Sequence, residues 1–262
     1  MGWLDALAKK PRAKESVEER MTGAYEAAAR GDYKAALEIW TPLAQAGVAR
    51  AQSNIGACFS EGLGVERDAK LAERWLVLAA DGGDPVGQRN LATLFFKGEG
   101  VEQDNARAAS LYRAAAEQGD AQARDMLSWM LLEGNGIAVD HAESRRWAQA
   151  AAEQGVAASM TRLGMIFHNA LGVERDATQA AMWWQRGAAA GDADGQAMLG
   201  AACHLGAGVA RDPLAALVWL TRARAGGSPL AAQFFDSVRA ALSPAEIAEA
   251  ERRAALPLEP AP

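Results

Sequence analysis

Apolar residues recur along this chain at three- and four-residue spacings, and the segments that carry them recur every 36 residues. Residues three and four apart share one face of an α-helix, so each segment predicts a helix with one buried side. No strand pattern competes with these helices, so the chain is expected to be all-α. In residues 85–120 the two apolar stripes are Gly87, Leu91, Ala92 and Phe95, then Ala108, Leu111 and Ala115.

Several columns of residues keep this 36-residue register without insertion or deletion. One glycine column closes a short loop at Gly64, Gly100, Gly136, Gly172 and Gly208. An aspartate column follows it at Asp68, Asp104, Asp140, Asp176 and Asp212. A bulky column lies at Trp75, Leu111, Trp147, Trp183 and Trp219. Such self-similarity indicates stacked helix-turn-helix units, an α-solenoid, rather than a globule closed around one centre.

The local chemistry of each repeat agrees with two helices joined by a tight loop. The run Gly98-Glu99-Gly100-Val101 interrupts the first helix, because glycine reaches the positive φ angles that a tight turn needs. Asp104 is expected to cap the second helix, and Gly119 to end it in a left-handed conformation. In the following repeat, Asp140 and Glu143 have the spacing of a capping box.

The register predicts five complete repeats, which are residues 49–84, 85–120, 121–156, 157–192 and 193–228. The flanking segments are expected to be atypical, since the terminal units of a solenoid expose one face to water. Residues 15–48 read as a degenerate first repeat, and residues 229–256 as C-terminal capping helices. Residues 1–14 are expected to form a flexible arm, and the proline-rich residues 257–262 a disordered tail.

Composition narrows the possible partners and compartments. A formal net charge of −6 gives no electrostatic footprint for nucleic acid. The first ten residues lack the apolar stretch of a secretory signal, and only Cys58 and Cys203 are present, at non-equivalent repeat positions. A disulfide framework is therefore not expected, and cytoplasm is the expected compartment.

Taken together, these columns resemble the Sel-1-like repeat, a relative of the tetratricopeptide repeat. The resemblance is carried by Ala121-Gln122-Ala123, Leu163-Gly164, Phe95, Gly98-Glu99-Gly100-Val101, Asp104, Trp147 and Ala150-Ala151-Ala152-Glu153-Gln154-Gly155. It is strong over residues 49–228 and weak on either side. Three residues depart from the pattern, namely Ala170 for the first loop glycine, Leu111 for tryptophan, and Arg224 in the double-alanine column. The resemblance implies a right-handed α-solenoid that acts as an adaptor for other proteins.

A partner is expected on the first helix of each repeat, on the side opposite its apolar stripe. Repeat positions 3, 7, 8 and 11 face the core, whereas positions 2, 5, 9 and 12 form the other stripe. In tetratricopeptide-like folds this second stripe lines a concave groove, which suits an extended or helical peptide. The candidate groove residues are Arg89, Thr93, Phe96, Asp125, Trp129, Leu132, Met165, His168 and His204.

Large apolar residues on an exposed face often mark a binding site. In this groove hypothesis Arg89 and Asp125 orient the peptide, and the two histidines lie at one end. The alternative is that these side chains pack against the helix of the next repeat, and the sequence leaves both readings open.

Catalysis is not expected, because it needs a unique place and a repeat offers the same place many times. No two histidines have the i, i+4 spacing of a helical metal site, and the aspartates read as caps, so no metal or cofactor is expected. A cysteine-rich branch of the family is associated with β-lactam binding or hydrolysis. This chain lacks the paired cysteines of that branch and any Ser-x-x-Lys arrangement.

A third class of function is a peripheral, membrane-tethered regulator. Trp3, Leu4 and Leu7 stand beside Lys9 and Lys10, a pattern that can contact an anionic surface. One short segment binds weakly and reversibly at best, so a simple arm is the favoured reading.

Overall fold

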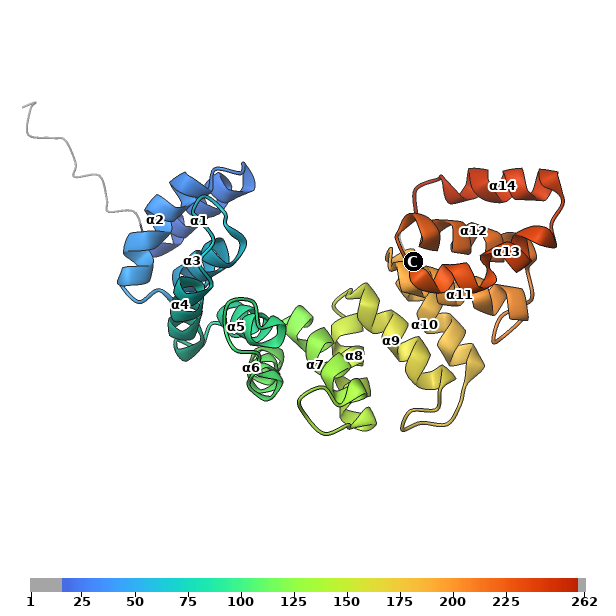
Figure 1. Ribbon diagram of the computed structural model, residues 1–262, viewed down its shortest axis with the longest axis horizontal. Helices are drawn as coiled ribbons and strands as arrows, with labels where there is room; N and C mark the ends of the chain where they lie inside the picture. Colours follow the sequence, from blue (N-terminus) through green and yellow to red (C-terminus); the bar gives the residue numbers. More distant parts are fainter. Residues whose placement is uncertain (1–15, 259–262) are drawn as a thin grey trace, which may run out of the picture. The chain divides into compact units, whose positions relative to one another are not determined.

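The computed structural model describes residues 16–258, and within them all regular structure is helical (Figure 1). The chain divides into two compact units, Met1–Asp104 and Asn105–Pro262. The first unit contains α1 Val17–Ala29, α2 Tyr33–Gln45, α3 Ala49–Glu61, α4 Ala69–Asp81 and α5 Pro85–Lys97. The prediction of an all-α chain of repeated helix pairs is therefore confirmed.

The second unit begins with the second helix of the repeat 85–120 and continues through the later repeats. Its helices are α6 Asn105–Glu117, α7 Ala121–Glu133, α8 His141–Ala152, α9 Ala157–His168, α10 Ala177–Ala189, α11 Ala193–Leu205, α12 Pro213–Ala225, the short 3₁₀ helix η2 Pro229–Ala231, α13 Ala232–Ala240 and α14 Pro244–Ala254. The arm of residues 1–14 and the last four residues of the expected tail lie outside the described residues.

Aspartate caps begin most of the second helices, as predicted. Asp68, Asp140, Asp176 and Asp212 each accept a hydrogen bond from a backbone N–H three residues later. The expected capping box at Asp140 is wrong in one respect. The Glu143 side chain does not reach back to the cap, because two arginines and a tryptophan bind it instead.

The first helices also have aspartate caps, which the sequence analysis missed. Asp84, Asp120 and Asp192 accept from the N–H groups at the third residue of α5, α7 and α11. Val48 and Val156 occupy the same repeat position before α3 and α9, and neither has a side-chain cap. The two valines interrupt the column and so hide it in the sequence.

The core of each repeat is wider than the apolar stripe indicates. Repeat position 10 on the first helix, outside the expected core positions, is buried in all five repeats, at Cys58, Leu94, Met130, Ile166 and Ala202. On α6 the expectation for Leu111 is wrong, because Leu111 is half-buried and the next residue, Tyr112, is only 1 % exposed. Equivalent core residues in α4, α10 and α12 are Leu76, Trp184 and Leu220.

A recurrent side-chain bond ties four of the second helices, α2, α4, α6 and α10, to the first helix of the next repeat. The fourth residue of the first helix donates to a backbone carbonyl eight residues earlier, near the end of the preceding helix. This bond is made by Gln52 to Ala44, Gln88 to Ala80, Arg124 to Ala116 and Gln196 to Ala188. It uses carbonyls at helix ends, where intrahelical partners run out.

The C-terminal cap explains one departure from the repeat pattern. Arg224, which stands where the repeat expects alanine, lies over the ring of Phe235 at 4.0 Å. Arg222 of α12 also holds the C-terminal end of α14, since it donates to the backbone carbonyls of Arg253 and Leu256. The terminal helices α13 and α14 therefore cover the last repeat through contacts that are specific to this end.

Candidate partner-binding site

In the first unit, three candidate residues lie on α5. Arg89, Thr93 and Phe96 are all half-buried, and the Thr93 hydroxyl donates to the Arg89 carbonyl at 3.0 Å. Beside Thr93 is a cavity of about 150 Å³, whose walls come mainly from α3 and α5. It is lined by Ala57, Ser60, Glu61, Leu76, Asn90, Thr93, Leu94, Lys97 and Glu99. The predicted face of this unit therefore includes a hollow with an apolar floor and a polar rim.

In the second unit, the candidate apolar residues are set apart from the core of their helices. On α7, Trp129 and Leu132 are half-buried, whereas the intervening Met130 and Leu131 are buried. On α9, Met165 is half-buried between two buried stretches of the same helix. These side chains thus keep part of their surface exposed while their neighbours fill the core.

Asp125 has a different surrounding from the other candidates. It is buried, and its carboxylate accepts from Ser159 and Arg162, both at 2.5 Å. Arg162 also donates to the Asp125 carbonyl at 3.2 Å. This paired, hydrogen-bonded carboxylate joins α7 to α9. Asp125 therefore holds the two helices together beneath the candidate binding face.

His168 and His204 occupy the same repeat position at the ends of α9 and α11, and both are half-buried. The His168 ring contacts Trp184, with centroids 5.3 Å apart, and the His204 ring contacts Phe234 at 6.0 Å. In each histidine Nδ1 is buried without a hydrogen-bond partner. One edge of each ring is therefore packed into the protein.

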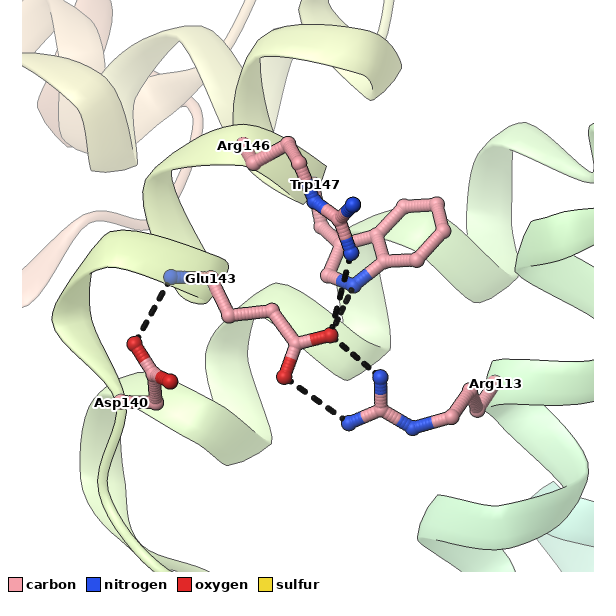
Figure 2. Close-up of polar contacts among 5 residues, drawn as sticks. All are labelled: Arg113, Asp140, Glu143, Arg146 and Trp147. Carbon is pink, nitrogen blue, oxygen red and sulfur yellow. Dashed lines mark hydrogen bonds and ion pairs between the residues drawn. The ribbon is translucent and has the colours of Figure 1, made fainter.

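A further polar cluster of the second unit lies on the second helices, and the sequence analysis did not predict it. Figure 2 shows the Glu143 carboxylate between Arg113 of α6 and the pair Arg146 and Trp147 of α8. Arg113 binds it with both terminal nitrogens, and the Trp147 Nε1–H donates to it at 3.1 Å. Arg113 lowers the pKa of Glu143 to about 2.

This cluster joins the second helices of two consecutive repeats. Other repeats have different residues at the positions of Arg113 and Glu143, so a search for columns cannot find the pair. An opposite-charge pair 30 residues apart, close to one repeat length, is the available sequence signal. Because both carboxylate oxygens accept from Arg113 and the cluster spans α6 and α8, we interpret it as a joint between repeats.

Metal-ligating side chains do not cluster in the described residues, and both of their thiols are buried. Within residues 16–258, no three His, Cys, Asp or Glu side chains gather as a metal site requires. Burial raises the pKa of the Cys58 thiol to about 11 and also raises the pKa of Cys203, which makes both poor nucleophiles. No helix in the described part is long and apolar enough to cross a membrane.

Comparisons with known proteins agree with the repeat architecture. A Sel1 repeat protein from Oxalobacter formigenes has 27% sequence identity and a TM-score of 0.80, over 91% of this chain and 97% of its own. A Pseudomonas aeruginosa protein, 5086, is 16% identical with a TM-score of 0.50, over 85% of this chain and 86% of its own, and shows the fold alone.

A comparison with curated proteins finds no match. The model of the family described as Sel1 repeat matches five consecutive segments, residues 49–84, 85–120, 121–156, 157–192 and 193–228. These segments cover more than half of the sequence, so this chain belongs to the Sel1 repeat family.

Proposed function

We propose that this protein is a non-enzymatic adaptor that binds a peptide or protein segment on the first helices of its repeats. Proteins of this family generally mediate protein–protein interaction. The formal net charge of −6 favours a protein over a nucleic acid as the partner. Both cysteines are free and buried, which suits a reducing compartment, so the proposal places the adaptor in the cytoplasm.

The observation that carries the proposal is the partial exposure of large apolar side chains on α7 and α9. Trp129, Leu132 and Met165 remain half-buried although the cores of both helices are filled by other residues. The position shared by Trp129 and Met165 holds a smaller residue in the other complete repeats, at Ala57, Thr93 and Ala201. Aromatic and methionine side chains are enriched at interfaces, where completing their burial favours binding.

The first unit supports the proposal separately, through the cavity between α3 and α5. A volume of about 150 Å³ accommodates one side chain of a partner rather than a free metabolite. Its floor includes Leu76 and Leu94, and Ser60, Asn90 and Thr93 supply hydrogen-bonding groups at its wall. Phe96 lies one turn after Thr93 on α5, and we assign it to the same contact surface.

The test is affinity capture from native lysate with mass spectrometry, comparing wild type with a Phe96→Ala/Trp129→Ala variant. A matched control carries Leu78→Ala and Met182→Ala, which remove exposed side chains from the second helices α4 and α10 of the same two units. Circular dichroism checks that all three proteins keep their helical content. We expect a partner that the control retains and the test variant loses by tenfold or more.

Two outcomes would contradict the proposal. If the test variant and wild type captured the partner equally, the partner would have to bind the second helices or the termini instead. Loss of helical content in the test variant alone would show that Phe96 and Trp129 serve the fold, which was the alternative left open by the sequence.

A further inference from the structure

Three second helices of the second unit each hold an arginine guanidinium over a tryptophan ring. The tryptophans share one repeat position, and the arginine Cζ lies 4.7, 4.9 and 5.3 Å from the ring centroid on α8, α10 and α12. The pairs are Arg146 with Trp147, Arg186 with Trp183, and Arg222 with Trp219. Because the ring attracts the cation through its face, the N–H groups of the guanidinium remain available to an acceptor.

On α8 this pair binds a carboxylate. The Glu143 Oε1 accepts from the Trp147 Nε1–H at 3.1 Å and from Arg146 at 3.2 Å (Figure 2). The indole N–H and the stacked guanidinium therefore meet at one oxygen. Glu143 lies one turn before Trp147 on the same helix, so α8 supplies the acceptor itself.

On α12 the arginine of the pair binds a separate piece of the chain. It follows its tryptophan by three residues, as the arginine on α10 does. Arg222 donates to the backbone carbonyl oxygens of Arg253 and Leu256, at 3.0 and 2.8 Å. An arginine at this spacing can thus reach an oxygen acceptor that its own helix does not provide.

On α10 the same two donors have no acceptor in the described part of the chain. Arg186 is exposed and makes no ion pair or hydrogen bond there. The Trp183 Nε1–H also makes no hydrogen bond, yet it is not one of the fully buried polar atoms that lack a partner, so it reaches solvent. Gln179 stands at the repeat position of Glu143, and α10 contains no Asp or Glu.

The charge of these helices favours an acidic partner. Helices α8, α10 and α12 contain two, one and two arginines, and Glu143 is their one carboxylate. The whole chain has a formal net charge of −6, so this excess of positive charge is local. A basic surface attracts an acidic partner and repels a basic one.

We infer that Trp183 and Arg186 form an open binding site for an aspartate or glutamate side chain of a partner protein. The site lies on a second helix, so it goes beyond the first-helix surface of the proposed function. A carboxylate accepts from both donors on α8, and on α10 it would neutralise an arginine that has no ion pair. Gln149 replaces Arg113 at the preceding repeat, so we expect a weaker and reversible contact.

Binding is tested by titrating the full chain, ¹⁵N-labelled at tryptophan, with the peptide acetyl-Ala-Glu-Glu-Ala-amide. Trp183→Phe assigns the indole N–H signal of Trp183 among those of the eight tryptophans. We expect a saturable shift of this signal, which a matched peptide with two glutamines does not produce. Arg186→Gln should raise the dissociation constant about fivefold, the effect of an exposed ion pair.

Arg175→Gln is the matched control for the loss of charge. Arg175 is exposed in the loop before α10 of the same repeat. Because solvent screens a charge that does not touch the ligand, this variant should change the dissociation constant less than about twofold. The other tryptophan signals report whether each variant is folded.

A further variant supplies the missing acceptor from within the chain. Gln179→Glu places a carboxylate at the repeat position of Glu143, and the backbone bond from residue 179 to Asp176 is kept. We expect it to shift the Trp183 signal without peptide. It should also raise the dissociation constant of the peptide about fivefold or more, because an intramolecular acceptor has a high effective concentration. Gln179→Ala leaves the site open and should bind as wild type does.

Three results would overturn the inference. The Trp183 signal could stay unmoved by the glutamate peptide or move equally with the glutamine peptide, so that the pair does not select a carboxylate. Equal weakening by Arg175→Gln and Arg186→Gln would show that net charge attracts the peptide. Unchanged peptide binding by Gln179→Glu would show that the peptide lies elsewhere. None of these results bears on Phe96 or Trp129, so the first-helix adaptor surface is decided by its own capture experiment.

Discussion

At the scale of single residues, the loop that follows α9 is strained at one position. Ala170 has a φ of 56°, the only positive φ of a non-glycine residue within residues 16–258. The other complete repeats place glycine at this position, with φ between 66° and 74°. A left-handed conformation costs an L-residue with a Cβ roughly 1 kcal/mol relative to glycine.

Replacing Ala170 by glycine should therefore stabilise the protein. We expect Ala170→Gly to raise the free energy of unfolding by up to about 1 kcal/mol, because the left-handed strain that it removes, roughly 1–2 kcal/mol, exceeds the entropy that glycine adds to the unfolded chain. Guanidinium denaturation followed by circular dichroism measures it. The reverse change, Gly206→Ala, should cost a similar amount, since a Cβ there meets no atom closer than 3.4 Å. An unchanged denaturation midpoint for both variants would contradict this prediction. It would show that the loop adjusts to an alanine side chain at this position without loss of stability.

Three glycines on the first helices leave room for a core side chain of the second helix of the same repeat. Gly164 accommodates the indole of Trp184, and Gly56 and Gly200 accommodate Leu76 and Leu220 in the same way. A Cβ at Gly56 or Gly200 would lie 2.6 or 2.8 Å from the leucine Cγ. The repeat thus needs complementary volumes, which the sequence shows as columns of small and large residues.

Gly164→Ala should destabilise the protein although alanine is the better helix former. Overpacking against Trp184 costs roughly 1 to 3 kcal/mol, more than the helix propensity gained. Gly23→Ala on α1 is the matched control, because nothing lies within 4 Å of its Cβ position, and it should gain up to about 1 kcal/mol. Thermal unfolding of both variants measures whether Gly164→Ala loses stability and Gly23→Ala gains it. A stabilised Gly164→Ala would refute the volume argument.

At the scale of helices, capping differs between repeats that otherwise share one plan. The second helices have an aspartate column that predicts their caps, and the structure confirms four of them. Among the first helices, α9 has Val156 as its N-cap residue and no side-chain cap, although the backbone angles of Val156 are close to those of Asp120 before α7. The geometry for a cap is therefore present before α9 without the acceptor.

Supplying that acceptor should stabilise α9. We expect Val156→Asp to raise the free energy of unfolding by about 1 kcal/mol, because its carboxylate can accept from the free N–H groups of the first turn. Asp120→Ala removes such a cap from α7 and should lose at least as much. Urea denaturation of both variants is the measurement. A loss of stability in Val156→Asp would mean that burial of the valine outweighs the cap.

At the scale of the whole molecule, acid sensitivity should follow from the joint between α6 and α8. The pKa of Glu143 is lowered from 4.5 to about 2, mainly by the hydrogen bonds from Arg113. Because the folded pKa lies below the unfolded one, this carboxylate stabilises the protein above pH 4.5, and the contribution is lost as the pH falls towards 2.

The difference in the free energy of unfolding between wild type and Glu143→Gln should therefore become smaller as the pH falls. Near pH 7 we expect the variant to be less stable by about 1 kcal/mol, a modest value because the side chains of Glu143 and Arg113 are 21% and 38% exposed. Urea denaturation at intervals between pH 7 and pH 2 tests the trend. A constant difference over this range would show that shape, and not charge, accounts for the effect.

The sequence also left parts of the candidate face undetermined. Positions on one helix stripe could be assigned from the 36-residue register alone, which is how Trp129, Met165 and His168 were selected. That register could not show that Asp125 pairs with Arg162, or that His168 packs on Trp184, because those partners come from the neighbouring repeat or helix. A side chain on a predicted stripe can therefore have either a structural or a binding role.

The sequence by itself determined the helical class, the repeat length and the family. Each of these depends on local spacing and on turn residues, and the same pattern occurs in every repeat. Only the tertiary structure decided where the core widens, as at Met130 and Tyr112, because burial depends on helices packed on more than one side. It also decided the division of the chain between α5 and α6. Because the 36-residue period gives every loop the same sequence pattern, the pattern does not show at which loop the packing between helices changes.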